Sequence, residues 1–359
     1  MASRVEIAEI REHELPEVAR FLEGERPGAE DAGGAGLPRI DPEHLRWFLF
    51  RNPASADDLP KGWLARAEGR PVGVKFCAPQ RFQHRGRPYT LLMGGGYYVS
   101  RQHRGVGLSL MKRYLDLAPR HAHFATTMNE VSGAIYERYG GYPIPETDRE
   151  LLGVLHWSPL VEELLVRRFG RPGPARLAAR AAALRPAGLR GDAAAAGRLE
   201  PLDAASLAHH GIATPPEHAD QITGLRDPDF LRWRYFEGPD ATRALFVFTA
   251  SDGTRALLGV NRRPRGHRGQ VRALTVLDVW GALAPAGVVE AARALASRFR
   301  DQADVVVLRG LHEPRRRALV AAGAVERPFA RAIGVCIDRA NLLPTRAWYM
   351  VPADGDMGH

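Results

Sequence analysis

One arginine and two glycines lie where an apolar, aromatic run gives way to a helical pattern. Arg104, Gly105 and Gly107 occur in "YYVSRQHRGVGLSLMKRYLD" at 97–116. The first N–H groups of a helix have no partner within the helix and attract anions. Glycines there remove Cβ atoms that would keep a phosphate from the backbone. The segment therefore predicts a phosphate site, and a plain tight turn is the alternative that it leaves open.

The elements around this corner form hairpins first and alternate with helices later. We expect strands at 5–10, 62–82 (two strands joined by a turn), 89–100, 121–127 and 149–157, and helices at 15–24, 43–50, 106–117 and 130–140. Asp41 and Pro42 supply an N-cap and a first-turn proline for the second helix. The glycines at 94–96 indicate a bulge or a close backbone approach. This order predicts an α+β fold with a mixed, mostly antiparallel sheet flanked by helices.

The chain contains an internal repeat. "DPEHLRWFLFRNP" recurs as "DPDFLRWRYFEGP" at an offset of 186, and residues 83–99 and 129–141 match 266–282 and 312–324 at an offset of 183. Three matches in the same order indicate two copies of one unit. We therefore expect one domain over 1–158, a linker rich in Ala, Arg and Pro over 159–196, and a second domain over 197–359.

Two motifs in the first copy resemble those of the GNAT family of acyl-CoA-dependent N-acetyltransferases. The first is R/Q-x-x-G-x-G/A after a strand, which here is "RGVGLS" with Ser109 where Gly or Ala is usual. The second is N-x-x-A-x-x-x-Y-x-x-x-G, which here is Asn129, Ser132 for the alanine, Tyr136 and Gly140. Both departures leave a small side chain, although an extra Gly141 precedes Tyr142. The resemblance implies two tandem GNAT-like domains and acetyl-CoA, or another acyl-CoA, as co-substrate.

The resemblance also implies a role for each matching residue. Tyr136 is the phenol expected to protonate the leaving thiolate. The backbone of Tyr97, Tyr98 and Val99 would pair with the pantetheine arm, the N–H groups of Arg104, Gly105, Val106, Gly107, Leu108 and Ser109 would bind the pyrophosphate, and Asn129 would contact the cofactor's arm. Tyr136 as a core aromatic and Asn129 as a helix N-cap are the alternatives.

The general base is not assigned. Glu130, His121 and His123 are nearest in the sequence to the second motif. Glu130 is matched by Glu313 in the second copy, which favours a structural role in the first turn of a helix. The histidines are typical of surface or packing residues on a strand.

The second copy lacks the features expected of the cofactor site. Its corner, "GALAPAGVVEA", has no arginine, and Glu290 is expected in the first helical turn, where it would repel a pyrophosphate. Leu319 replaces the tyrosine and His312 replaces the asparagine. We infer that this copy keeps the fold and walls off the substrate cleft, supports dimerisation, or is only a structural remnant.

Composition restricts the class of protein. The net charge of +9 is spread along the chain, which disfavours a dedicated nucleic-acid face. Cys77 and Cys336 lie far apart and in no metal-ligand spacing, so no metal is expected. No segment has the run of about 20 apolar residues that a membrane span needs. A cytoplasmic protein is the default.

Asp354 and Asp356 near the C-terminus are interpreted as a solvated tail, with binding of a cationic amine as the alternative.

These observations predict an N-acyltransferase that moves an acetyl or other acyl group from acyl-CoA to a primary amine of a small molecule. An amino sugar is one candidate acceptor, and a homodimer is left open. The alternative is a non-catalytic protein that binds acyl-CoA or has a regulatory role.

Overall fold

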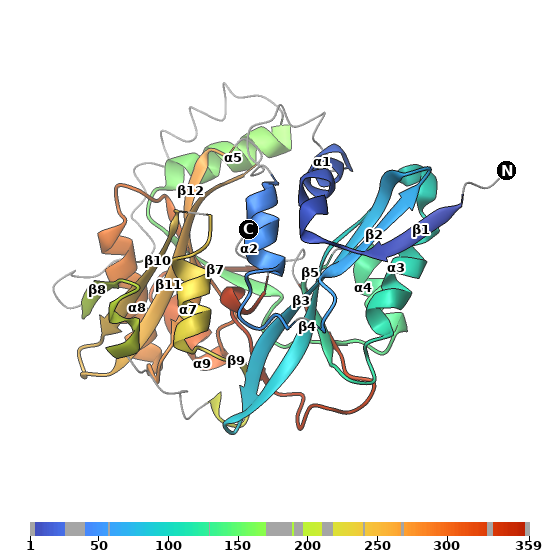
Figure 1. The fold of residues 1–359 in the computed structure, drawn as a ribbon. Coiled ribbons are helices and arrows are strands. Elements are labelled where there is room, and N and C mark those ends of the chain that lie inside the picture. The colour runs from blue at the N-terminus through green and yellow to red at the C-terminus, as the bar shows by residue number, and fades with distance from the viewer. Residues whose placement is uncertain are drawn as a thin grey trace.

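The structure is a computed structural model, and it describes residues 4–25, 40–56, 58–128, 130–169, 189, 197–209, 218–239, 241–266, 269–328 and 333–355. These residues form two sheets with helices packed on them, as Figure 1 shows. The predicted α+β class is confirmed. The α-helices are α1 (Leu15–Glu25), α2 (Pro42–Leu49), α3 (Val106–Leu115), α4 (Glu130–Arg138), α5 (Trp157–Phe169), α7 (Pro228–Tyr235), α8 (Pro285–Arg298) and α9 (Glu313–Ala321).

The first sheet has the strand order β1-β2-β3-β4-β5-β15-β6, with β9 attached to β3 and β16 attached to β9. Its pairs are antiparallel except β4 with β5 and β16 with β9. The strands are β1 (Val5–Glu9), β2 (Gly62–Ala67), β3 (Arg70–His84), β4 (Arg87–Val99), β5 (His123–Met128), β6 (Tyr142–Pro143), β9 (Ile222–Gly224), β15 (Ile333–Ile337) and β16 (Trp348–Tyr349).

The second sheet repeats this pattern with the order β8-β10-β11-β12-β13-β7-β14. Its one parallel pair, β12 with β13, corresponds to β4 with β5. The strands are β7 (Arg149–Val154), β8 (Arg198–Leu202), β10 (Arg243–Thr249), β11 (Arg255–Arg265), β12 (Val271–Trp280), β13 (Val305–Arg309) and β14 (Val325–Pro328). The repeat seen in the sequence is therefore also a repeat of topology.

The last strand of each copy lies in the sheet of the other copy. β7 was expected to complete the sheet of the first copy, and this expectation is wrong. It pairs with β13 and β14 in the second sheet, while β15 pairs with β5 and β6 in the first. An apolar strand pattern predicts a buried strand but does not select a partner, and two sheets of one design leave equivalent gaps. The division at 158 and 197 stays a prediction about the sequence repeat.

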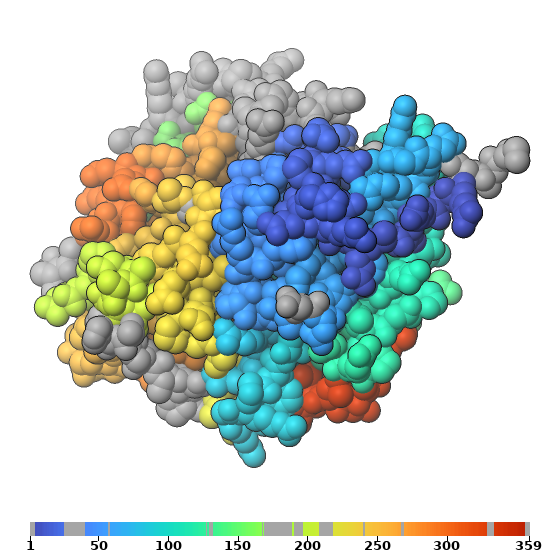
Figure 2. Space-filling model, in the orientation of Figure 1, coloured from blue at the N-terminus to red at the C-terminus, as the bar shows by residue number. Residues whose placement is uncertain are grey.

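Helices α2 and α7 hold the two copies together. Each begins with the predicted aspartate cap and first-turn proline: Asp41 accepts from the Glu43 N–H at 2.9 Å, and Asp227 accepts from the Phe230 N–H at 2.8 Å. The two helices lie side by side at the centre of the molecule, blue against yellow in Figure 2. Their apolar faces share one continuous hydrophobic core with the first sheet and with β10, β11 and β12.

A separate core fills the other face of the first sheet. It packs α3 and α4 against β2, β3 and β5, and Tyr114 and Tyr136 are among its buried side chains. None of the helices in the described ranges has the length and apolar character needed to cross a membrane.

Candidate active site

Strands β4 and β5 pair over a short length and then separate. The parallel ladder joins Leu92 to His123 and Met93 to Phe124. Beyond Met93, β4 keeps its pairing with β3 as far as Val99, with a bulge near Lys75. No further β4–β5 pairing occurs among the described residues. Residues 94–99, which include the predicted backbone site at Tyr97, Tyr98 and Val99, therefore have β3 on one side and lie beyond the ladder with β5 on the other.

The predicted anion site lies just after the end of this stretch. Helix α3 begins at Val106, and Gly105 occupies its N-cap position without a side-chain cap. The first turn contains no acidic residue, and Arg104 and Gly105 are exposed. A Cβ added at Gly105 would meet nothing within 4 Å. The backbone at this corner is therefore open to an anion, and the nearest charged side chain in the sequence is a cation.

Gly107 has a packing function, and its predicted role in binding the pyrophosphate stays a prediction. It is buried, and an added Cβ would lie 2.6 Å from the Tyr97 hydroxyl oxygen. Its N–H donates to the carbonyl of Arg104 at 3.1 Å. Gly107 therefore makes room for the side chain of Tyr97, which links β4 to the start of α3.

Tyr136 projects from α4 onto the point where β4 and β5 separate. Its side chain is 2 % exposed, and its hydroxyl oxygen lies 3.2 Å from Lys75 Nζ. Both polar atoms face Gly94, the residue after the last β4–β5 pair, where an added Cβ would collide with the Tyr136 hydroxyl and lie 2.6 Å from Nζ. Gly94 thus explains the predicted close backbone approach in the glycine run. Asn129 lies outside the described residues.

Lys75 is the residue that sequence reasoning missed. It is 1 % exposed, and its Nζ lies 4.6 Å from the ring centre of Tyr114, 5.4 Å from that of Tyr97 and 5.7 Å from that of Tyr136. The only signal in the sequence is a lysine within the otherwise apolar "VGVKFCA" of β3. Such a strand is typical of a sheet covered on both faces, where an unpaired lysine is costly.

Burial distinguishes the two histidines that are candidates for the general base. His123 is fully buried, and its Nε2 contacts the Tyr114 carbonyl at 2.9 Å. Burial lowers the pKa of His123 to about 3. Such a ring is a weak base and a packing residue. His121 is half-buried and lies two residues before β5, and the side chain of Glu130 lies outside the described residues.

The second copy has an apolar side chain at the position of Tyr136 and a proline at the start of the helix equivalent to α3. Leu319 is the seventh residue of α9, as Tyr136 is of α4, and it is buried. Helix α8 starts with Pro285, which has no N–H to offer an anion. The expectation for Glu290 is wrong: α8 begins earlier than expected, so Glu290 lies in the second turn and accepts from the Ser251 N–H and hydroxyl.

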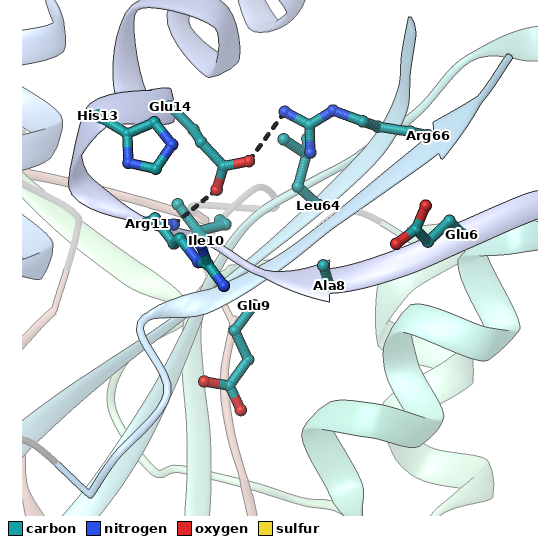
Figure 3. Close-up of a pocket in the computed structure, with 9 residues that line it drawn as sticks. All are labelled: Glu6, Ala8, Glu9, Ile10, Arg11, His13, Glu14, Leu64 and Arg66. Carbon is teal, nitrogen blue, oxygen red and sulfur yellow. Dashed lines mark hydrogen bonds and ion pairs between the residues drawn. The ribbon is translucent and has the colours of Figure 1, made fainter. Parts of the chain in front are cut away.

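Two surface hollows flank the first sheet. One of about 480 Å³ lies along β1 and the short helical turn at 12–14 that precedes α1 (Figure 3), and its Glu14 is held by Arg66 and by the Arg11 N–H. No predicted site residue lines it. The other, of about 460 Å³, follows the exposed face of α3, where it includes Leu108 and Ser109. It also includes Arg339 of the second copy, whose guanidinium lies 5.1 Å from the ring centre of Tyr139.

The interpretation of Asp354 as part of a solvated tail is wrong. Asp354 is 2 % exposed and lies in a short helical turn, η6 (Pro352–Asp354). Its Oδ1 is 2.6 Å from the guanidinium of Arg226, which also bonds Asp278 at 2.5 Å. Paired in this way, the carboxylate does not offer a site for a cationic amine. Asp356 lies outside the described residues.

The fold is similar to those of several solved structures. A protein from Enterococcus faecalis described as a probable N-acyltransferase matches with a TM-score of 0.53 and 11% identity, over 93% of this chain and 72% of that one. N-myristoyltransferase from Saccharomyces cerevisiae with bound myristoyl-CoA matches with a TM-score of 0.58 and 13% identity, over 100% of this chain and 85% of that one. A GCN5-related N-acetyltransferase from Kribbella flavida matches with a TM-score of 0.52 and 11% identity, over 93% of this chain and 71% of that one.

No model of a protein family matches the chain, and no curated protein matches its sequence. At the identities of the three solved structures the likeness is one of fold. The chain therefore has the tandem GNAT-like fold found in N-acetyltransferases and in N-myristoyltransferase.

Proposed function

We propose that the protein is an acyl-CoA-dependent N-acyltransferase that transfers an acetyl or another acyl group to a primary amine. The fold supports the reaction class, because its structural neighbours are N-acyltransferases by name. The first copy carries the site, and the second copy keeps the architecture with leucine in place of the expected acid. A small molecule, with an amino sugar as one candidate, is the acceptor that the sequence favours.

One observation carries the proposal. The open corner at Arg104 and Gly105 and the hydroxyl of Tyr136 lie at opposite ends of the stretch of β4 that runs beyond the ladder with β5. From Gly94 to Val99 a strand covers about 17 Å. The pantetheine arm of CoA is an extended chain of that order with two amides, which can pair with a strand edge. A pyrophosphate at the start of α3 would then bring the thioester to Gly94 and Tyr136.

The residues of this site would act in order. A neutral amine attacks the thioester carbonyl, a C–N bond forms, and charge develops on the carbonyl oxygen, where a backbone N–H of β4 can stabilise it. The C–S bond then breaks, and Tyr136 donates its proton to the departing sulfur. Since Tyr136 is buried, this transfer takes place away from water, where an ionic interaction is strongest.

Binding and turnover test the proposal separately. Acetyl-CoA is titrated against the wild-type chain, and free thiol is then followed with a panel of amino sugars, polyamines, amino acids and peptides. Saturable binding together with amine-dependent thiol release is the expected result. Absence of acyl-CoA binding would overturn the proposal. Binding without thiol release for acetyl-CoA and longer acyl-CoAs would favour the alternative of a non-catalytic acyl-CoA-binding protein.

A further inference from the structure

Lys75 is a buried cation that donates a hydrogen bond to the proposed acid. Its Nζ lies 3.2 Å from the Tyr136 hydroxyl oxygen, inside a ring of three tyrosine side chains from β4, α3 and α4. Aromatic faces stabilise a desolvated ammonium group through their quadrupoles. The three rings offset part of the cost of burying the ammonium group beside the phenol of Tyr136.

An ammonium group can donate hydrogen bonds but cannot accept one. In the contact with Lys75, the oxygen of Tyr136 must therefore be the acceptor. The hydrogen of the phenol is left to point elsewhere, and Gly94 lies next to both polar atoms without a side chain in the way. The Tyr114 hydroxyl, which donates to the Leu92 carbonyl at 2.7 Å, also adjoins Gly94 and hydrogen-bonds to Tyr136, so the contact with Lys75 fixes the phenol oxygen and not the direction of its hydrogen.

The second copy shows that the fold does not need this pair. Lys75 precedes Phe76, which pairs with Gly95 across the sheet, and Leu258 precedes Gly259, which pairs with Asp278. Leu258 therefore occupies the position of Lys75, as Leu319 occupies that of Tyr136. Both leucines are fully buried in one hydrophobic cluster. The lysine and the tyrosine are replaced together, which is the pattern of two groups that work as a unit.

We infer that Lys75 is the positioning residue of Tyr136: its hydrogen bond holds the phenol oxygen beside Gly94, and its charge stabilises the phenolate left behind. This inference rests on the proposed function. In the step, the O–H bond of Tyr136 breaks and an S–H bond forms, while the electron pair stays on the phenol oxygen beside the ammonium. The acylated nitrogen releases its extra proton to solvent, and Tyr136 regains a proton once CoA has left and water enters the site, so each turnover leaves the enzyme unchanged.

A double-mutant cycle tests the coupling between the two residues. Lys75→Met, Tyr136→Phe and the double variant are compared with wild type for kcat and for KM of acetyl-CoA, with the best amine of the panel. Lys75→Met is expected to lower kcat about tenfold or more with little change in KM, because an adjacent charge shifts a phenol by at least about one pKa unit. In the Tyr136→Phe background the same change is expected to have little effect. Equal losses in both backgrounds would overturn the inference.

Two further measurements distinguish a role of Lys75 in proton transfer from a purely structural effect of its replacement. In the pH profile of kcat, the alkaline limb is expected to move to higher pH in Lys75→Met. In Lys75→Arg, it is expected to stay near its position in wild type. The other titratable groups near Lys75 are Tyr97, Tyr114, His123 and Cys77, so loss of the limb in Tyr136→Phe assigns it. An unmoved limb would overturn the inference. If Lys75→Met does not fold, two other variants replace it. One is the double variant Lys75→Leu with Tyr136→Leu, which has the side chains found at these positions in the second sheet, and the other is Lys75→Arg.

The outcome for wild type separates this inference from the proposed function. If wild type releases thiol and the cycle shows no coupling, only the role of Lys75 is wrong. If wild type binds acetyl-CoA but releases no thiol with any amine, the proposed function fails and the role of Lys75 fails with it.

Discussion

Trp47 and Trp233 donate their indole N–H groups to each other's backbone carbonyls, at 2.9 and 3.0 Å. Their rings are stacked with centroids 4.7 Å apart. The two residues occupy the same position in the two copies, 186 residues apart in the chain. A reciprocal contact of this kind places them across an approximate two-fold axis. Equivalent residues of the sequence repeat thus form the contact that joins the two halves.

Truncating Trp47 is expected to destabilise the whole chain. The side chain is fully buried between the copies, so Trp47→Ala should cost about 3–5 kcal/mol in the free energy of unfolding. Denaturant unfolding measures this change. Arg85→Ala is the control, because its ion pair with Asp220 also joins the copies but is exposed. A similar loss in both variants would contradict this account of the interface.

Removing the hydroxyl of Tyr136 is expected to impair turnover more than binding. Tyr136→Phe keeps the buried ring and removes the proposed acid, so kcat should fall by about 100-fold while KM for acetyl-CoA changes little. Tyr139→Phe is the matched control, since Tyr139 follows the same helix and is only partly buried. Normal thiol release by Tyr136→Phe would rule out its role as the acid.

Reversing the charge at the corner is expected to weaken binding of acyl-CoA. Arg104→Glu places a carboxylate beside the uncapped start of α3, so Kd for acetyl-CoA should rise about tenfold, and less at high salt. Calorimetry at two salt concentrations measures both effects. Arg113→Glu makes the same charge change in the last turn of α3, and equal effects of the two substitutions would argue against a local anion site.

Glu150 is expected to stabilise the exchanged strand β7 in a pH-dependent way. Burial raises the pKa of Glu150, but Arg265, Arg309 and Arg327 lower it more, so the net shift is downward. A lowered pKa in the folded state stabilises the fold above the unfolded-state pKa, about 4.3, and this contribution is lost as pH falls through the folded-state value.

Glu150→Gln should therefore cost about 3 kcal/mol near neutral pH and much less at about pH 3. Unfolding by denaturant at the two pH values measures the difference. Glu200→Gln on β8 is the control, because that carboxylate is exposed and pairs with Arg198. A loss from Glu150→Gln that does not depend on pH would contradict the electrostatic explanation.

The exchange of β7 and β15 predicts that the halves depend on each other. Residues 1–169 and 197–359, produced together as two chains, should purify as one complex, because each supplies a strand to the sheet of the other. Each half alone would lack a strand between two others and expose the edges of both. Affinity purification through a tag on one half, with circular dichroism of each half alone, tests this. Cooperative unfolding of either isolated half would show that it does not need the exchanged strand.

Local patterns predicted most of the elements of the first copy correctly. The capped helix α2, the turn between β2 and β3 and the helix after the glycine corner all depend on neighbours in the chain: an aspartate and a proline, a left-handed Glu68 and Gly69, and a run of helix formers. The internal repeat was also visible, because it compares one part of the sequence with another. The predicted site residues 97–99, 104–109 and 136 were found by motif spacing, and their roles stay predictions.

The sequence by itself determined most elements of the first copy, their order and the existence of two copies, because these depend on short-range preferences and on self-similarity. Only the tertiary structure decided which sheet receives β7 and β15, since two similar sheets offer equivalent gaps to either strand. It also decided that Asp354 is buried against Arg226, and that Lys75 meets Tyr136, 61 residues later in the chain. Contacts of this kind depend on packing and on burial of charge, and no local pattern encodes them.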